Sequence, residues 1–267
     1  MVDQHNAIGV FDSGVGGIST LRTLTRMLPD EDFIFYGDSA NAPYGEKSAD
    51  QVYELTRAAV DHLRDHTVKA IVIACNTATS AAKPELMKRY PDIPFLGIEP
   101  ALKLAVDSGK KNILVMATPL TLSLQKFHDQ MRRFGNDANI YPLPCPRLAE
   151  LIEKGPSALP EIEDYLSELL APVRQHPLDG VVLGCTHYPF IADTIREILG
   201  PDVEPFTGFE GLARNLERQL GKRGLLRSPA PDSGTQPHTQ SVEFMSSKNT
   251  EAELALYRKL YERGFSE

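Results

Sequence analysis

Short, continuous runs of apolar and β-branched residues alternate along this chain with segments of helical periodicity. Five runs predict buried strands, at residues 7–11, 33–36, 70–74, 112–116 and 180–184. The helical pattern after the first run places four apolar residues on one face: Ile18, Leu21, Leu24 and Leu28. Continuous apolar runs are typical of strands covered on both faces. The order of elements therefore predicts an α/β fold with mostly parallel sheets flanked by helices.

Capping signals and apolar stripes predict further elements. Ser48, followed three residues later by Gln51, has the pattern of a capping box and begins a helix. Other helices are expected at residues 121–134, 160–174, 190–199 and 251–263, and an edge strand at 242–245. Turn-forming residues predict loops at 37–46 and 227–240, and the second of these is expected to be flexible.

Both halves of the chain contain a strand that ends at a cysteine. The run at 70–74 ends at Cys75, and the run at 180–184 ends at Cys185. Ligands of open α/β sheets bind at the carboxyl ends of the strands. An internal duplication would give two similar domains related by a pseudo-twofold axis, with the cysteines on opposite walls of one cleft. A chance likeness between two α/β halves is the alternative.

Composition narrows the classes of function. The net charge of −8 gives no general attraction to nucleic acid or to an anionic membrane. No apolar run approaches the ~20 residues that span a bilayer, and residues 1–6 lack the pattern of a secretory signal. A cytoplasmic location is therefore expected. Three cysteines do not form a disulfide framework, so they are expected to act as thiols.

Two cysteines at equivalent strand ends suit proton transfer at a carbon atom. Inversion at Cα removes a proton from one face and delivers another to the opposite face, which two flanking groups do without moving. A thiol has an ordinary pKa of about 8.5, and nearby donors or a charged histidine favour the thiolate. The alternative is that Cys75 and Cys185 are small buried apolar residues, which is the commoner role of a free cysteine.

The residues after each cysteine favour the catalytic alternative. Asn76 and Thr77 begin a helix, where an amide, a hydroxyl and backbone N–H groups can hold a carboxylate. Thr186 and His187 follow Cys185, and a histidine there can relay a proton. Helix capping and a structural histidine are the alternatives. Asp12 and Ser13 end the first strand at the same sheet edge as Cys75, where they serve either proton handling or a turn.

A glycine-rich turn follows the first strand. Gly14, Gly16 and Ser19 nearly match a dinucleotide-binding fingerprint, with Ser19 in place of the third glycine. A dinucleotide-dependent oxidoreductase is therefore one hypothesis, and it gives the cysteines no role. Cys185 and His187 lack further partners at metal-ligand spacing, so no metal is expected. Nothing in the sequence pattern indicates a lysine that forms a Schiff base with pyridoxal phosphate.

Taken together, these motifs resemble glutamate racemase, within the superfamily that also holds aspartate racemase. The likeness runs in family order from residue 8 to about 200. It rests on Ile8–Gly17, Tyr36–Asp38, Pro43–Gly45, Ala74–Thr79, Gly97–Ala101, Ala117–Pro119 with Thr121, and Gly184–Pro189. One departure is Pro205–Ala213, where the family usually has a Ser-rich patch followed by Glu-Thr-Ala.

The resemblance implies a cofactor-independent enzyme of two α/β domains with the active site in the cleft between them. The first domain would comprise residues 1–97 and 208–267, and the second residues 98–207. Cys75 would act on the D-enantiomer with support from Asp12, and Cys185 on the L-enantiomer with support from His187. Substrate contacts would come from Ser13, Pro43, Tyr44, Gly45, Asn76, Thr77, Thr118, Thr121, Glu153 and Thr186.

The implied reaction is the interconversion of L- and D-glutamate, which supplies D-glutamate for peptidoglycan and so for the bacterial cell wall and cell shape. The resemblance also implies a homodimer, with no nucleic-acid or membrane partner. Two alternatives remain at this point. Aspartate is shorter than glutamate by one methylene, a difference worth only about 1–3 kcal/mol to a pocket. A non-catalytic protein that binds an acidic amino acid is the other.

Overall fold

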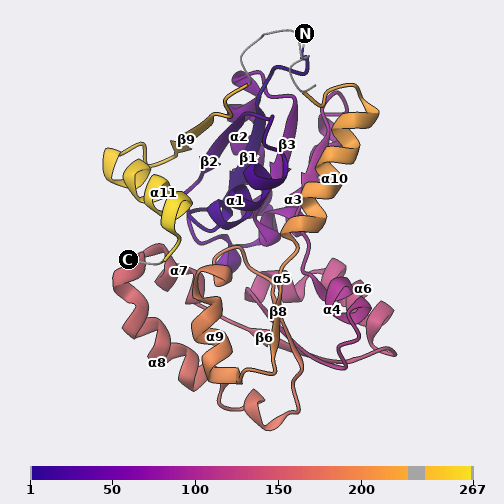
Figure 1. Cartoon of the computed structure of the whole chain (residues 1–267), viewed down its shortest axis with the longest axis vertical. Coiled ribbons are helices and arrows are strands. Elements are labelled where there is room, and N and C mark those ends of the chain that lie inside the picture. Colours follow the sequence, from indigo (N-terminus) through magenta and orange to yellow (C-terminus); the bar gives the residue numbers. More distant parts are fainter. Residues whose placement is uncertain (1, 228–237, 266–267) are drawn as a thin grey trace.

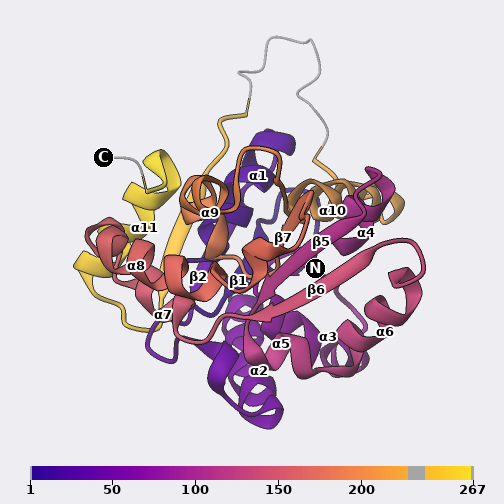
Figure 2. The same cartoon turned by 90° about the horizontal axis from the view of Figure 1, so that it is seen from below.

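The computed structural model, which describes residues 2–227 and 238–265, contains two parallel sheets (Figures 1 and 2). The first sheet has the order β4-β3-β1-β2-β9 and the second the order β6-β5-β7-β8. The strands of the first are β1 (Ile8–Asp12), β2 (Phe33–Gly37), β3 (Ala70–Ile73), β4 (Phe95–Gly97) and β9 (Val242–Ser246). Those of the second are β5 (Asn112–Ala117), β6 (Asn139–Pro144), β7 (Gly180–Leu183) and β8 (Glu204–Phe206).

Helices flank each sheet, and Figure 1 places the two groups one above the other. Around the first sheet lie α1 (Gly17–Met27), α2 (Ala49–Asp65), α3 (Asn76–Arg89), α10 (Phe209–Lys222) and α11 (Glu251–Arg263). Around the second lie α4 (Leu102–Asp107), α5 (Pro119–Ser123), α6 (Gln125–Phe134), α7 (Leu148–Glu153), α8 (Leu159–Leu170) and α9 (Ala192–Leu199). The predicted two-domain α/β fold is confirmed.

The two sheets have the same topology apart from β9. The central strands β1 and β5 each pair with the next strand on one side and with the strand after that on the other. The order β4-β3-β1-β2 therefore matches β8-β7-β5-β6 strand for strand. Cys75 follows β3 and Cys185 follows the equivalent strand β7. This shared order supports the predicted internal duplication.

The core explains why the strands are apolar on both faces. Val10 and Val72 pack with α1, α10 and α11, whereas Phe11 and Ile73 pack with α2 and α3. The cluster that contains Val10 extends through Tyr188 into the second sheet, so apolar packing joins the two units. No helix in residues 2–227 and 238–265 is long and apolar enough to cross a membrane.

Several predicted boundaries change in the structure. Residues 121–134 form two helices, α5 and α6, because Leu124 between them has extended backbone angles. The helix expected at 190–199 starts as the 3-10 turn Tyr188–Ile191, and the one expected at 160–174 ends at Leu170 before the 3-10 turn Val173–Gln175. The capping box of Ser48 and Gln51 is confirmed.

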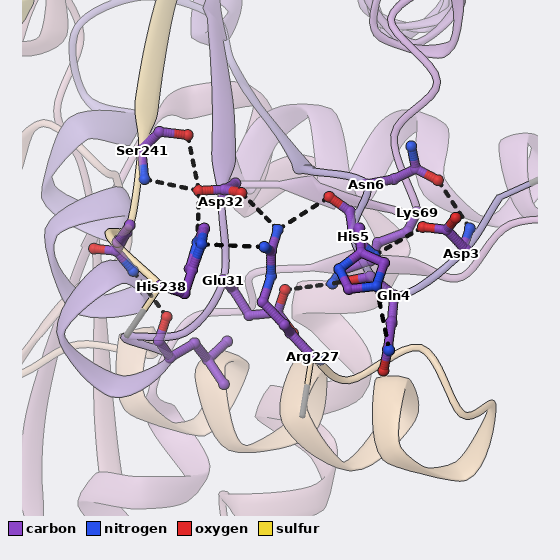
Figure 3. Close-up of polar contacts among 12 residues, drawn as sticks. Asp3, Gln4, His5, Asn6, Glu31, Asp32, Lys69, Arg227, His238 and Ser241 are labelled. Carbon is purple, nitrogen blue, oxygen red and sulfur yellow. Dashed lines mark hydrogen bonds and ion pairs between the residues drawn. The ribbon is translucent and has the colours of Figure 1, made fainter. Parts of the chain in front are cut away.

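The strand expected at 242–245 is β9, at the edge of the first sheet beside β2. Most of the loop predicted at 227–240, residues 228–237, lies outside the described residues. Its flanks meet at Asp32, whose carboxylate accepts hydrogen bonds from Arg227, His238 and Ser241 (Figure 3). We call these four residues the Asp32 clamp.

Candidate active site

Cys75 lies at the point where β3 becomes α3. Its backbone is extended, and its Sγ atom caps the helix by accepting a hydrogen bond from the Ala78 N–H at 3.4 Å. The side chain is 5% exposed. Because the helix starts here, Asn76 and Thr77 also lie at its N-terminus, where backbone N–H groups favour an anion.

Asp12 is fully buried at the end of β1, next to β3. Its carboxylate accepts hydrogen bonds from the Gly14 N–H at 3.1 Å and from the Thr186 hydroxyl at 3.0 Å. Burial raises the pKa of Asp12 to about 6, against the lowering effects of His187 and of these hydrogen bonds. The carboxyl group therefore titrates close to neutral pH.

The surroundings of Cys75 favour the neutral thiol. Burial is the main cause that raises the pKa of Cys75 to about 12, and the charge of Asp12 adds to it. Hydrogen bonds from Ala78 and Ser13 act in the opposite direction. In the absence of a substrate, Cys75 is therefore a proton donor rather than a base.

Cys185 has a different partner. Its Sγ atom lies 3.5 Å from Nδ1 of His187, and Nε2 of that ring lies 2.6 Å from Oε1 of Glu153. Burial by itself lowers the pKa of His187, but Cys185 and Glu153 outweigh it and hold that pKa well above its usual value. The imidazole of His187 therefore stays protonated beside the sulfur.

The glycine-rich turn after β1 packs directly against Glu153 and His187. A Cβ atom at Gly14 would lie 1.8 Å from Oε1 of Glu153, and one at Gly16 would lie 2.5 Å from Nδ1 of His187. The Val15 N–H donates to the same Glu153 oxygen at 2.9 Å. These glycines are therefore required for contact with the second sheet's side chains, which explains the turn without a dinucleotide.

Three threonine hydroxyls from the two units form a buried triangle. The Oγ1 atoms of Thr77, Thr118 and Thr121 lie 2.9–3.1 Å apart. Gly45 packs against Thr118, because a Cβ there would lie 2.5 Å from the threonine Cβ. The nearby helix α3 also holds Asn76, whose buried Oδ1 has no hydrogen-bond partner among the described residues. The three hydroxyls can donate to the carboxylates of a small acidic ligand, whereas the Asn76 Oδ1 can only accept a hydrogen bond.

The loop after β2 carries Pro43, Tyr44 and Gly45 to the same edge of the sheet. The Tyr44 hydroxyl donates to Oδ2 of Asp38 at 2.6 Å, and Asn41 donates to both oxygens of that carboxylate. Tyr44 is 1% exposed and packs in the apolar cluster that includes Cys75. The internal hydrogen bonds therefore fix the loop beside the first thiol.

The structure joins several of the residues that the sequence singled out. Contacts join Asp12 with Thr186, Cys185 with His187 and Glu153, and Thr77 with Thr118 and Thr121. Sequence reasoning noted Ser19 only as a replacement for a fingerprint glycine, whereas its hydroxyl lies 2.8 Å from the Thr186 carbonyl oxygen. It also gave no role to Asp38. Only the tertiary contacts show what these two residues hold in place.

No group of three His, Cys, Asp or Glu side chains suited to a metal ion occurs in residues 2–227 and 238–265. The candidate site contains two unlike pairs of titratable groups. One is a protonated thiol beside a carboxyl group. The other is a thiol beside a charged histidine.

The model of the Asp/Glu/Hydantoin racemase family matches residues 8–205, which include both cysteines. The chain belongs to the Asp/Glu/Hydantoin racemase family. The glutamate racemase of Clostridium novyi (strain NT) is 52% identical over 220 residues, which cover 82% of this chain and 85% of that protein. The glutamate racemase of Clostridium botulinum (strain Alaska E43 / Type E3) is 42% identical over 263 residues, 98% of this chain and 99% of that protein.

A solved structure extends the likeness to the whole fold. The glutamate racemase of Francisella tularensis subsp. tularensis SCHU S4, in complex with D-glutamate, matches with a TM-score of 0.80 and 28% identity. The match covers 98% of this chain and 95% of that one. The resemblance found in the sequence motifs is thereby confirmed.

Proposed function

We propose that this chain is a glutamate racemase that interconverts L- and D-glutamate with two thiols. The observation that carries the proposal is that two buried cysteines at equivalent strand ends have unlike partners. Burial raises the pKa of Cys75 to about 12, whereas charged His187 lies 3.5 Å from the Cys185 sulfur. We infer from these partners that Cys75 serves as the acid and Cys185 as the base toward L-glutamate.

In the direction from L to D, the Cys185 thiolate removes the Cα proton and becomes a thiol. The electron pair of the C–H bond stays on the substrate as a carbanion conjugated with its carboxylate. The Cys75 thiol gives its proton to the opposite face, which yields D-glutamate and a Cys75 thiolate. Release of the Cys185 proton to solvent and uptake of a proton by the Cys75 thiolate restore the starting state, and the reverse direction exchanges the two roles.

Asp12 and His187 support one thiol each. Asp12, with a pKa of about 6, is largely ionised at neutral pH and can accept a proton at the Cys75 side. His187 keeps a positive charge beside Cys185, and Glu153 orients its ring. The proposed reaction needs no cofactor or metal, because the thiols carry both protons.

The remaining predicted residues are proposed to hold the two carboxylates and the ammonium group of glutamate. Ser13, Asn76, Thr77 and Thr186 surround the thiols, and Thr118 and Thr121 complete the hydroxyl triangle. Pro43, Tyr44 and Gly45 close the site from the loop after β2. Cys75 and Cys185 are 5% and 7% exposed, so access for the substrate requires the two units to separate.

We assign residues 1–97 and 208–267 to one domain and residues 98–207 to the other. Pairing of β9 with β2 and the membership of the two sheets support this division. The product would serve peptidoglycan synthesis in the cytoplasm of a bacterium, and thereby the cell wall and cell shape. We further propose a homodimer that has no nucleic-acid or membrane partner.

The test is to incubate the purified protein with L-glutamate or D-glutamate, without added cofactor, and to follow the circular dichroism signal. We expect the signal to decay to zero from both sides. Cys75→Ala and Cys185→Ala should each abolish the decay, while Cys145→Ala, the third cysteine, keeps it. Decay with aspartate alone would retain the mechanism and reject the substrate. No decay with either amino acid would reject the proposal.

A further inference from the structure

The phenol of Tyr257, on the C-terminal helix α11, packs against Gly37 at the end of β2. The proposed substrate loop, residues 38–45, begins directly after Gly37. Tyr257 is fully buried, and its hydroxyl lies 2.7 Å from Oγ of Ser39. A Cβ atom at Gly37 would lie 2.1 Å from that hydroxyl. Gly37 has an ordinary negative φ, so close approach of the phenol, rather than backbone conformation, requires glycine here.

Ser39 belongs to the loop that carries the proposed substrate contacts. It follows Asp38, whose carboxylate accepts the Tyr44 hydroxyl and whose backbone N–H donates to the Asp12 carbonyl at 3.0 Å. A backbone hydrogen bond therefore joins the loop to Asp12. The Tyr257 hydroxyl holds the same loop through the neighbouring residue Ser39.

The same C-terminal segment makes further contacts with this loop. The Ala40 N–H donates to Oγ of Ser247 at 2.9 Å, and the Ser247 N–H donates to the Gly37 carbonyl at 3.0 Å. Tyr257 also donates to Oγ of Ser246 at 3.4 Å. The loop thus rests on β9 and α11, which follow it in sequence by about two hundred residues.

The Asp32 clamp holds the start of β9, at the opposite end of the strand from Ser246 (Figure 3). Asp32 accepts hydrogen bonds from the N–H and the hydroxyl of Ser241, directly before β9, at 2.7 and 2.8 Å. These contacts and the parallel pairing with β2 set the register of β9, and hence the height of Ser246 and Ser247 against the loop.

We propose that Tyr257 is a positioning residue that sets the substrate loop 38–45 through its hydrogen bond with Ser39. This inference rests on the proposed function, because the loop is taken to contact glutamate. Tyr257 itself does not touch the proposed reacting groups. Its loss should therefore weaken substrate binding more than proton transfer.

Tyr257→Phe removes the hydroxyl and keeps the ring. That ring packs edge-on against Phe35, with the two ring centroids 5.4 Å apart. We expect KM for both glutamate enantiomers to rise about five- to tenfold with a smaller change in kcat. Since the two enantiomers are equally stable, kcat/KM must fall by the same factor in both directions. Ser39→Ala should have the same effect, and the double variant should be no worse than either single variant.

Tyr261→Phe is the matched control. It removes a hydroxyl from the same helix, and that hydroxyl donates to Thr25 on α1 rather than to the loop. KM should stay at the wild-type value in this variant. An unchanged KM in Tyr257→Phe, or an equal rise in Tyr261→Phe, would overturn the positioning role while leaving the racemase assignment intact.

Hydrogen–deuterium exchange separates the two proposals. The amides of residues 38–45 should exchange faster in Tyr257→Phe than in Tyr261→Phe, whatever the substrate is. If the wild-type protein does not racemise glutamate but this difference appears, the function is wrong and the positioning role stands. Equal exchange in the two variants would contradict the positioning role directly.

Discussion

The Val15 N–H and the Glu153 carboxylate form a hydrogen bond of 2.9 Å between the two halves of the molecule. The same oxygen of Glu153 lies 2.6 Å from Nε2 of His187, the proposed partner of Cys185. The glycine-rich turn of the first half therefore helps to place His187, a proposed proton-transfer group, in the second half. Separation of the two units would break this link, so closure and assembly of the site are coupled.

Gly14→Ala should disable the enzyme because its Cβ would lie 1.8 Å from Oε1 of Glu153. Displacement of Glu153 misplaces His187, and we expect kcat/KM for glutamate to fall roughly 100-fold. Steady-state kinetics by circular dichroism measures the loss. Gly211→Ala is the control, since among the described residues no atom beyond its chain neighbours and the backbone of α10 lies within 4 Å of its Cβ position. Comparable activity in the two variants would contradict this account of the turn.

Glu153→Gln should change the pH dependence of racemisation. Loss of the carboxylate removes one of the causes that raise the pKa of His187, so that pKa falls. A histidine with a raised pKa is charged below it and loses the charge as the pH rises through it. The alkaline limb of kcat/KM should therefore move to lower pH, with kcat reduced about 10- to 100-fold. Glu150→Gln, exposed on the same helix α7, should leave the profile unmoved.

Asp12→Asn should abolish or strongly reduce activity and yet stabilise the fold at neutral pH. The pKa of Asp12 rises from 3.8 to about 6 on folding, so ionisation of the buried carboxyl opposes folding. This cost is absent below pH 3.8, grows between pH 3.8 and 6, and is complete above. It amounts to about 2–3 kcal/mol, since one pKa unit is about 1.4 kcal/mol.

Urea unfolding of wild type and Asp12→Asn at pH 4 and pH 7.5 measures this difference. The variant should gain free energy of unfolding relative to wild type as the pH rises. The Asn side chain keeps an acceptor for the Gly14 N–H and can donate to the Thr186 hydroxyl. A difference that does not depend on pH would show that the Asp12 carboxyl is not destabilised by burial.

Asp32→Ala should release the start of β9. The carboxylate accepts hydrogen bonds from Arg227, His238 and Ser241, and we expect a loss of about 2–4 kcal/mol in the free energy of unfolding. These partners hold the pKa of Asp32 below its usual value despite partial burial, so the stabilisation is present above pH 3.8 and is lost as the pH falls. Asp30→Ala, exposed two residues earlier, is the control in thermal unfolding.

Sequence reasoning predicted the parts of the fold in which local pattern and tertiary structure agree. Strands β1, β2, β3, β5 and β7 are continuous apolar runs and were found. β6 was missed because it contains two prolines and has no fully buried residue, and β8 because it has only three residues, with Pro205 at its centre. Their strand character comes from pairing with β5 and β7.

The candidate site could be predicted where a motif carries the chemistry, as at Cys75 and Cys185. The reason for the glycine-rich turn could not be predicted. The side chains that a Cβ atom at Gly14 or Gly16 would clash with come from the other half of the chain. The same holds for Gly37, whose partner Tyr257 is distant in sequence. Local sequence indicates that such a glycine is unusual, and only the fold shows what approaches it.

The most direct test of the central claim is proton NMR of the early reaction in deuterium oxide, started from each enantiomer of glutamate. Two separate thiols predict that the first product molecules carry deuterium at Cα, while the remaining substrate keeps its proton. This pattern should hold in both directions. Retention of the substrate proton in the product, or deuterium appearing equally in recovered substrate and product from the start, would contradict the two-thiol mechanism.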